Sequence, residues 1–147
     1  MSSNHPIHIL IADDDEEDCA FVRKALGLAC VSNDLHFVHD GEELMDYLRG
    51  RGRYAGSGLA PRPGLILLDI KMQKQDGFSC LAAIKSDESL RQIPVVILTT
   101  SSADEDISRG YDLGVDLFVT KPVTFDGLVQ AMRGLGQYWF EIVDLPA

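Results

Sequence analysis

Five short apolar runs, each followed by a polar residue and then a helical pattern, limit the fold of this chain more than any other feature. The five runs lie at residues 7–12, 35–38, 65–68, 95–98 and 117–119. The first of them lacks the alternating polarity of a strand with one solvated face, so we expect it to be a strand that is buried on both faces.

Helical periodicity separates these runs. We expect helices from residue 15 or 16 onward, at 42–49, at 77–85, at 104–113, and from a last start near Thr124, a residue suited to an N-cap. Strands that alternate with single helices form right-handed crossovers and a parallel sheet with helices on both faces. The pattern therefore predicts an α/β fold with a doubly wound, parallel five-stranded sheet.

The length of 147 residues suits one domain, with a core over about residues 7–138 and a tail at 139–147. The main irregularity is residues 50–64, "GRGRYAGSGLAPRPG". A connection of this length is either functional or flexible. We expect flexibility, because only Tyr54 and Leu59 offer apolar anchors.

Composition excludes several classes of function. The net charge of −10 argues against unaided binding to nucleic acid, which depends on basic residues. No apolar run approaches the ~20 residues that cross a bilayer, and the start "MSSNHP" has no signal-peptide pattern, so we expect a cytoplasmic protein without membrane contact. Cys19, Cys30 and Cys80 are widely spaced, which indicates reduced thiols.

Polar side chains stand where the expected strands end. Asp13 and Asp14 follow the first run, Asp69 the third, Thr99 the fourth and Lys121 the fifth. Ligands of a doubly wound sheet bind outside the carboxyl ends of its strands. We therefore expect these five residues to converge.

Clustered carboxylates raise one another's pKa unless positive charge balances them. Lys121 supplies one charge, and Mg²⁺ is the cation that favours oxygen ligands. A carboxylate beside Mg²⁺ and an ammonium is an acceptor suited to phosphoryl transfer, because an aspartate can carry the group covalently.

In this order, the acidic pair, the later aspartate, the threonine and the Lys-Pro pair resemble the receiver domain of two-component response regulators, over about residues 7–138. The resemblance implies a flavodoxin-like, CheY-like (βα)5 sandwich with strand order 2-1-3-4-5. It also implies that Asp69 is the phosphoacceptor. Asp14 would bind Mg²⁺ directly, Asp13 would bind it through water, and the backbone carbonyl of Lys71 would complete the protein ligands.

The same resemblance assigns the switch. Thr99 matches the hydroxyl that moves toward the phosphoryl group, and Lys121 matches the lysine that binds it. The aromatic switch position holds Phe118 where the family has tyrosine, so a hydroxyl hydrogen bond is lost while ring rotation is retained. The family often has a cis bond at the position of Lys121–Pro122.

The acceptor loop also departs from the family pattern. Gln73 stands where proline is common, which predicts a less rigid loop, although Asp76 and Gly77 keep the turn. Lys71 and Ser101 occupy positions that set the rate of autodephosphorylation in the family.

The remaining acids of "DDDEED" have a simpler interpretation. An acidic first turn is stabilised by the dipole of its helix. We expect Asp15, Glu16, Glu17 and Asp18 to serve only this purpose.

The last helix ends in "YWFEIVDLP", which is apolar on most sides. Such a helix end favours burial against a second surface, so Tyr138, Trp139 and Phe140 are expected at a homodimer interface. Three segments resemble the single-domain regulators that partner bacterial phytochrome histidine kinases: the long loop at residues 50–64, the stretch "KSDESLRQIPVVILTTS" and this tail. Those relatives dimerise through the fourth helix, fifth strand and fifth helix.

The expected function is that of a phosphorelay response regulator that receives its phosphoryl group from a histidine kinase, such as a bacteriophytochrome. It is not expected to be an enzyme beyond self-catalysed phosphotransfer and autodephosphorylation, and we expect no DNA-binding output domain. A phosphate sink for the kinase stays open. An aspartyl-phosphate phosphatase is a second alternative, but it would need an acid where Lys71 stands. A flavin carrier is a third, but the negative charge of "DDDEED" would repel the phosphate of the flavin.

Overall fold

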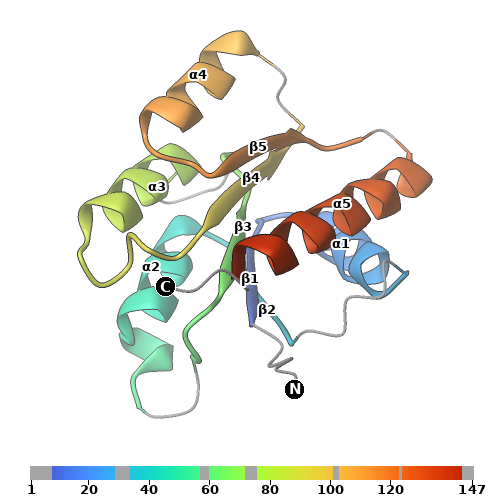
Figure 1. Ribbon diagram of the computed structural model, residues 1–147. Coiled ribbons are helices and arrows are strands. Elements are labelled where there is room, and N and C mark those ends of the chain that lie inside the picture. The colour runs from blue at the N-terminus through green and yellow to red at the C-terminus, as the bar shows by residue number, and fades with distance from the viewer. Residues whose placement is uncertain are drawn as a thin grey trace.

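The structure is a computed structural model that describes residues 8–28, 34–56, 60–71, 76–100, 103–122 and 124–143; the side chains of residues 28 and 136–143 are outside this description. Its five strands form one parallel sheet in the order β2-β1-β3-β4-β5 (Figure 1). The strands are β1 (Ile9–Ala12), β2 (Leu35–Val38), β3 (Leu65–Leu68), β4 (Val95–Thr99) and β5 (Leu117–Thr120). The predicted fold class and strand order are confirmed.

Helices connect the strands in the predicted alternation. They are α1 (Glu16–Leu28), α2 (Gly41–Arg49), α3 (Gly77–Ser86), α4 (Asp104–Asp112) and α5 (Phe125–Val143), with a short 3-10 helix η1 (Gly52–Tyr54). Capping explains several starts: Asp40 accepts the N–H of Glu43 at 2.7 Å, and Thr124 accepts that of Gly127 at 3.0 Å. The N-cap expected at Thr124 is confirmed.

Side chains of the central strands alternate between two cores. Leu10, Ile66 and Ile97 point to the core under α2 and α3, whereas Ile11, Leu67 and Val96 point to the core under α1 and α5. Figure 1 shows α1 and α5 on one face of the sheet and α2 and α3 on the other. Burial on both faces explains why β1, β3 and β4 lack polar alternation, whereas the edge strands β2 and β5 are largely half-buried.

Helix α5 continues to Val143, so it includes the first residues of the expected tail at 139–147. Among the residues that the structure describes, no helix is long and apolar enough to span a membrane.

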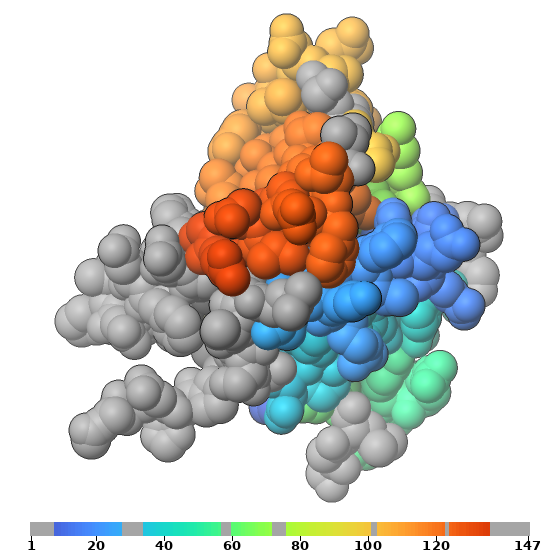
Figure 2. Space-filling model, turned by 90° about the vertical axis from the view of Figure 1, so that its right-hand side faces the viewer, coloured from blue at the N-terminus to red at the C-terminus, as the bar shows by residue number. Residues whose placement is uncertain are grey.

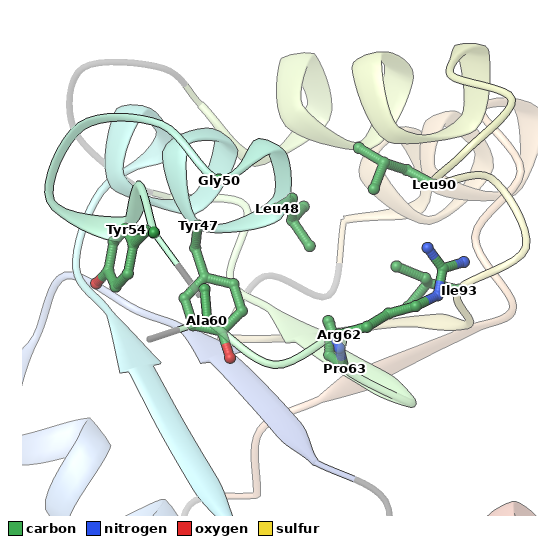
Figure 3. Close-up of a pocket in the computed structure, with 10 residues that line it drawn as sticks. Tyr47, Leu48, Gly50, Tyr54, Ala60, Arg62, Pro63, Leu90 and Ile93 are labelled. Carbon is green, nitrogen blue, oxygen red and sulfur yellow. The ribbon is translucent and has the colours of Figure 1, made fainter. Parts of the chain in front are cut away.

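The expected flexibility of residues 50–64 is wrong for the residues that the structure describes. The Tyr54 hydroxyl donates to Glu43 Oε2 at 2.6 Å, and its ring meets the Tyr47 ring edge-on at 5.0 Å between centroids. The Tyr47 hydroxyl donates to the Pro61 carbonyl at 2.9 Å. The two tyrosines and Arg62 border a pocket of about 210 Å³ (Figure 3). Two tyrosine anchors on α2 and η1 therefore hold residues 54 and 61 against α2.

Candidate functional site

The carboxyl ends of four strands bring the predicted site residues together. The register pairs Ala12 with Leu68 and Thr99 with Thr120, so the residues at and just after these positions share one edge of the sheet. Asp13, Asp69, Thr99 and Lys121 meet there through side-chain hydrogen bonds. The expected convergence is confirmed for these four residues.

Lys121 lies at the centre of the site, and its side chain is only 9% exposed. Its Nζ lies 2.8 Å from Asp13 Oδ2, 2.9 Å from Asp18 Oδ2 and 3.4 Å from Asp69 Oδ2. Burial alone would lower the pKa of Lys121, but the hydrogen bonds to Asp13 and Asp18 and the carboxylate charges outweigh burial and raise it. The amine therefore stays charged.

Asp13 is almost completely buried directly after β1. One oxygen accepts the N–H of Asp15 at 2.9 Å, and the other accepts from Lys121. Burial raises the pKa of Asp13, because desolvation outweighs these two hydrogen bonds, which favour the ionised form. One ammonium does not fully compensate the carboxylates gathered around it.

Asp69 is held at both oxygens. Oδ1 accepts the Thr99 hydroxyl at 3.1 Å and the backbone N–H of Lys71 at 2.9 Å, while Oδ2 faces Lys121. Its backbone N–H donates to the Ala12 carbonyl at 2.9 Å, which joins it to the end of β1. The carboxylate is thus fixed in orientation and faces a cation, as a nucleophile for a charged electrophile requires.

Gly77 fixes the loop that carries Asp69. A Cβ at this position would lie 2.4 Å from Ile70 Cα and 2.6 Å from the Asp69 carbonyl oxygen, so only glycine fits. The Gly77 N–H donates to the Ile70 carbonyl at 3.1 Å, and Asp76 caps α3 by accepting the N–H of Ser79. The predicted Asp76-Gly77 turn therefore locks the start of α3 onto the Asp69 backbone. Gln73 lies outside the described residues.

Thr99 and Phe118 connect the site to α4. Thr99 is fully buried, and Phe118 is half-buried on β5. A Cβ on Gly110 of α4 would come within 3.2 Å of the Phe118 ring and 3.1 Å of the Ile97 side chain, so α4 packs closely on both strands. The backbone N–H of Phe118 also donates to the Tyr111 hydroxyl at 3.2 Å. Helix α4 is therefore held closely against Phe118 and Ile97.

The donor set suits a divalent cation that prefers oxygen. Carboxylate oxygens of Asp13, Asp18 and Asp69 all lie within 4.8 Å of one another. Two ligands on opposite sides of Mg²⁺ are separated by about twice 2.1 Å, so small side-chain movements would be sufficient. Asp14 is exposed and outside this group, and Lys71 is exposed beside Asp69.

Asp18 is the site residue that sequence reasoning missed. It was expected only to stabilise the start of α1, and it does lie in the acidic first turn, but its carboxylate also pairs with Lys121. A signal was present: Asp18 stands four residues before Val22 and seven before Ala25, on the buried stripe of α1. An acid in line with core residues faces the protein interior.

A hollow of about 240 Å³ opens beside Lys121 between α1 and α5. Asp18, Phe21 and Phe125 border it, and Phe21 is 52% exposed although it is a large apolar residue. Figure 2 shows α1 and α5 side by side on this face. The hollow therefore lies next to Lys121 and to its partner Asp18.

Three other expectations have different outcomes. No cis peptide bond occurs among the described residues, so the cis Lys121–Pro122 bond that the family resemblance implied is not found. The expected dimer residues Tyr138, Trp139 and Phe140 belong to α5, but their side chains lie outside the part of the chain that the structure describes. Cys30 and Ser101 also lie outside it. Cys19 and Cys80 are free and buried, as predicted.

Comparison with known proteins agrees with this geometry. Residues 9–133 match the family described as response regulator receiver domain. The chain is 38% identical over 145 residues to response regulator Rcp1 of Synechocystis sp. (strain ATCC 27184 / PCC 6803 / Kazusa), which covers 99% of this chain and 97% of that protein.

Two solved structures have the same fold. A crystal structure of the phosphorylated cyanobacterial phytochrome response regulator RcpA superposes with a TM-score of 0.86 at 39% identity, over 97% of this chain and 99% of that one. The Mn²⁺-bound form of Rcp1 superposes with a TM-score of 0.85 at 37% identity, over 97% of this chain and 100% of that one.

Proposed function

Because the chain belongs to the response regulator receiver family, and is homologous to regulators named for phytochrome signalling, we propose that Asp69 accepts a phosphoryl group from a histidine kinase. The observation that carries this assignment is the geometry of Asp69. One oxygen is held by Thr99 and the Lys71 N–H, and the other faces the buried ammonium of Lys121. A fixed carboxylate beside a cation is suited to attack on an anionic phosphoryl group.

The transfer is balanced with a phosphohistidine donor. A carboxylate oxygen of Asp69 bonds to phosphorus while the P–N bond to the donor imidazole breaks, and the leaving imidazole takes a proton from solvent. Lys121 offsets the charge on the transferred oxygens. Attack of water on phosphorus later releases inorganic phosphate and restores the carboxylate, which makes the chain a phosphoacceptor that catalyses only its own reactions.

Mg²⁺ is the cofactor of this proposal, held by Asp13, Asp14, Asp69 and the Lys71 carbonyl. The carboxylate oxygens of Asp13 and Asp69, which lie within 4.8 Å of each other, support two of these ligands, and Rcp1 has been solved in a Mn²⁺-bound form. When bound, the ion would neutralise carboxylate charge and charge on the phosphoryl oxygens. Asp13 and Asp69 come from the ends of different strands, so the folded sheet is needed to assemble the ligands.

The switch follows from the packing around Thr99. When its hydroxyl turns from Asp69 toward a phosphoryl oxygen, space changes beside Phe118, whose ring packs on Gly110 of α4. The α4-β5-α5 surface would then shift between two arrangements, with couplings of about 1–3 kcal/mol typical of such changes. We assign homodimer or partner binding to this surface and to Tyr138, Trp139 and Phe140.

The partner is a histidine kinase, and the relatives favour the phytochrome class, because RcpA is described as a cyanobacterial phytochrome response regulator. Such a donor uses ATP, so the protein would act in the cytoplasm. Transfer from a purified phytochrome kinase, compared with unrelated histidine kinases at equal concentration, tests the partner. Equal rates from all donors would contradict the phytochrome assignment.

Intact mass spectrometry after incubation with a small phosphodonor and Mg²⁺ tests phosphorylation itself. The wild type should gain one phosphate, and Asp69→Ala should gain none. An adduct that persists in Asp69→Ala would contradict the assignment.

Sedimentation of Trp139→Ala tests the dimer surface, since assembly identical to the wild type would argue against it.

A further inference from the structure

The phosphotransfer proposed for Asp69 assigns no role to the ion pair between Asp18 and Lys121. Lys121 Nζ has three N–H donors, and three carboxylates surround it. The distance to Asp18 is 2.9 Å, whereas the distance to Asp69 is 3.4 Å. Asp18 is therefore a closer partner of the amine than the proposed acceptor is.

Asp18 is held on a fixed support. Asp15 caps α1 by accepting the N–H groups of Glu17 at 2.8 Å and of Asp18 at 3.3 Å. Cys19 and Val22 of the same helix are buried. Lys121 is fixed as well, because its backbone N–H donates to the Thr99 carbonyl at 2.6 Å. The two ends of the ion pair thus come from elements that are both anchored to the core.

The neighbouring acids provide an internal comparison. Glu16 and Glu17 belong to the same first turn and are exposed, as expected of acids that only interact with the helix dipole. The Asp18 side chain is 35% exposed and points toward Lys121. Position in the turn does not explain this contact.

We propose that Asp18 is a positioning residue for phosphotransfer, which holds the ammonium of Lys121 where its third N–H faces Asp69. Asp13 and Asp18 fix two donors, and the remaining donor is directed to the oxygen that carries the phosphoryl group. This inference rests on the proposed function of Asp69. Without Asp18 the amine would keep its charge but lose part of its fixed orientation, so the cation would face the reacting group less often.

The contact itself can be tested without phosphorylation. Lys121 is acylated with a short pulse of an amine-reactive ester, and the modified peptide is measured by mass spectrometry. Asp18→Asn should raise the rate at Lys121 about fivefold, in line with loss of one partly exposed ion pair. Glu17→Gln, with a side chain in the same turn but in solvent, should match the wild type. Equal rates in all three proteins would overturn the inference.

The role in phosphotransfer needs a double-mutant cycle with Lys121→Ala. Asp18→Asn should slow formation of the Asp69 adduct about tenfold in the wild-type background and leave it unchanged in Lys121→Ala, because Asp18 acts only through the amine. An equal slowing in both backgrounds, or no slowing in either, would contradict a positioning role. Equal thermal unfolding of Asp18→Asn and wild type excludes a general loss of structure.

Failure of the proposed function of Asp69 and failure of the inference about Asp18 give different results. If the wild type gains no phosphate on Asp69, the proposed function fails, and the acylation rates alone decide whether Asp18 holds Lys121. If the wild type is phosphorylated and Asp18→Asn reacts as fast, the proposed function stands and the inference about Asp18 is wrong. If Lys121→Ala forms no adduct, the acylation rates decide in the same way.

Discussion

Lys121 and Asp13 form a buried ion pair, with 2.8 Å between Nζ and Oδ2 and side-chain exposures of 9% and 3%. Asp18 and Asp69 also face this ammonium, so three carboxylates surround one cation. The site therefore has an excess of negative charge that burial makes unfavourable. This excess favours a divalent cation and at the same time lowers the stability of the fold.

Removing a negative charge from the site and removing the positive charge should have opposite effects on stability. Asp69→Asn keeps the size of the side chain and relieves the repulsion between Asp69 and the other carboxylates. Like charges at ~4 Å repel by up to about 4 kcal/mol, and Lys121 offsets much of this. The substitution should therefore raise the free energy of unfolding by about 1 kcal/mol. Lys121→Met leaves Asp13 buried without its partner and should lower the free energy by about 3 kcal/mol. Urea unfolding without Mg²⁺ measures both, and the reverse order would contradict this charge balance.

Gly77→Ala should lower the free energy of unfolding by more than about 2 kcal/mol, because the added Cβ would overlap the backbone of Asp69 and Ile70. Gly134→Ala is the matched control: it lies in α5, where an added Cβ would meet no atom within 4 Å, so it should gain up to about 1 kcal/mol. Chemical denaturation of both variants measures these changes in the free energy of unfolding. Equal effects would argue against the tight approach at Gly77.

The anchored tyrosines should ionise late. Burial raises the pKa of Tyr47 to about 12, and burial together with the hydrogen bond to Glu43 raises the pKa of Tyr54 to about 12. The unfolded chain loses these protons near pH 10, so between pH ~10 and ~12 the native state binds more protons and stability falls as pH rises.

Alkaline absorbance titration of wild type, Tyr47→Phe and Tyr54→Phe checks these values. The component that each variant loses should be centred near pH 12. A component centred near pH 10 would mean that the phenol is solvated and that residues 50–56 do not pack as described.

The buried thiols should react slowly. Burial and the charge of Asp13 raise the pKa of Cys19 to about 11, and burial raises the pKa of Cys80 to about 12. Because the thiolate fraction falls tenfold per unit, a pulse of iodoacetamide at pH 8 should label Cys19 about 100-fold more slowly than in urea. Peptide mass mapping gives the rates, and fast labelling of Cys19 in the native protein would refute its burial beside Asp13.

Sequence reasoning found the site because parallel strands end at a common edge. Asp13, Asp69, Thr99 and Lys121 each follow or end an apolar run, so their convergence could be predicted without any distances. Asp18 could not be assigned on this basis, because an acid in a first turn already has a sufficient explanation in the helix dipole. The rotation of α1 about its axis decides that Asp18 faces Lys121 while Glu17 faces solvent, and the buried stripe of Val22 and Ala25 was the signal for that rotation.

The loop at residues 50–64 illustrates a second limit. Its Gly and Pro content favours flexibility, but order came from Tyr54, whose partners Glu43 and Tyr47 lie on α2. Such contacts depend on tertiary packing that local composition does not encode. The cis bond at Pro122 was inferred from resemblance alone, and no feature of the chain itself had predicted it.

The role of Asp69 as the carrier of the phosphoryl group can be tested at the level of the single residue. Incubation with a small phosphodonor and Mg²⁺, borohydride reduction of the acyl phosphate and peptide mass mapping would identify the modified residue directly. We expect reduction at Asp69 in the wild type and at no other aspartate, with none in Asp69→Asn. Modification at Asp13, Asp14 or Asp18, or an unmodified Asp69 after full exposure to the donor, would contradict this role.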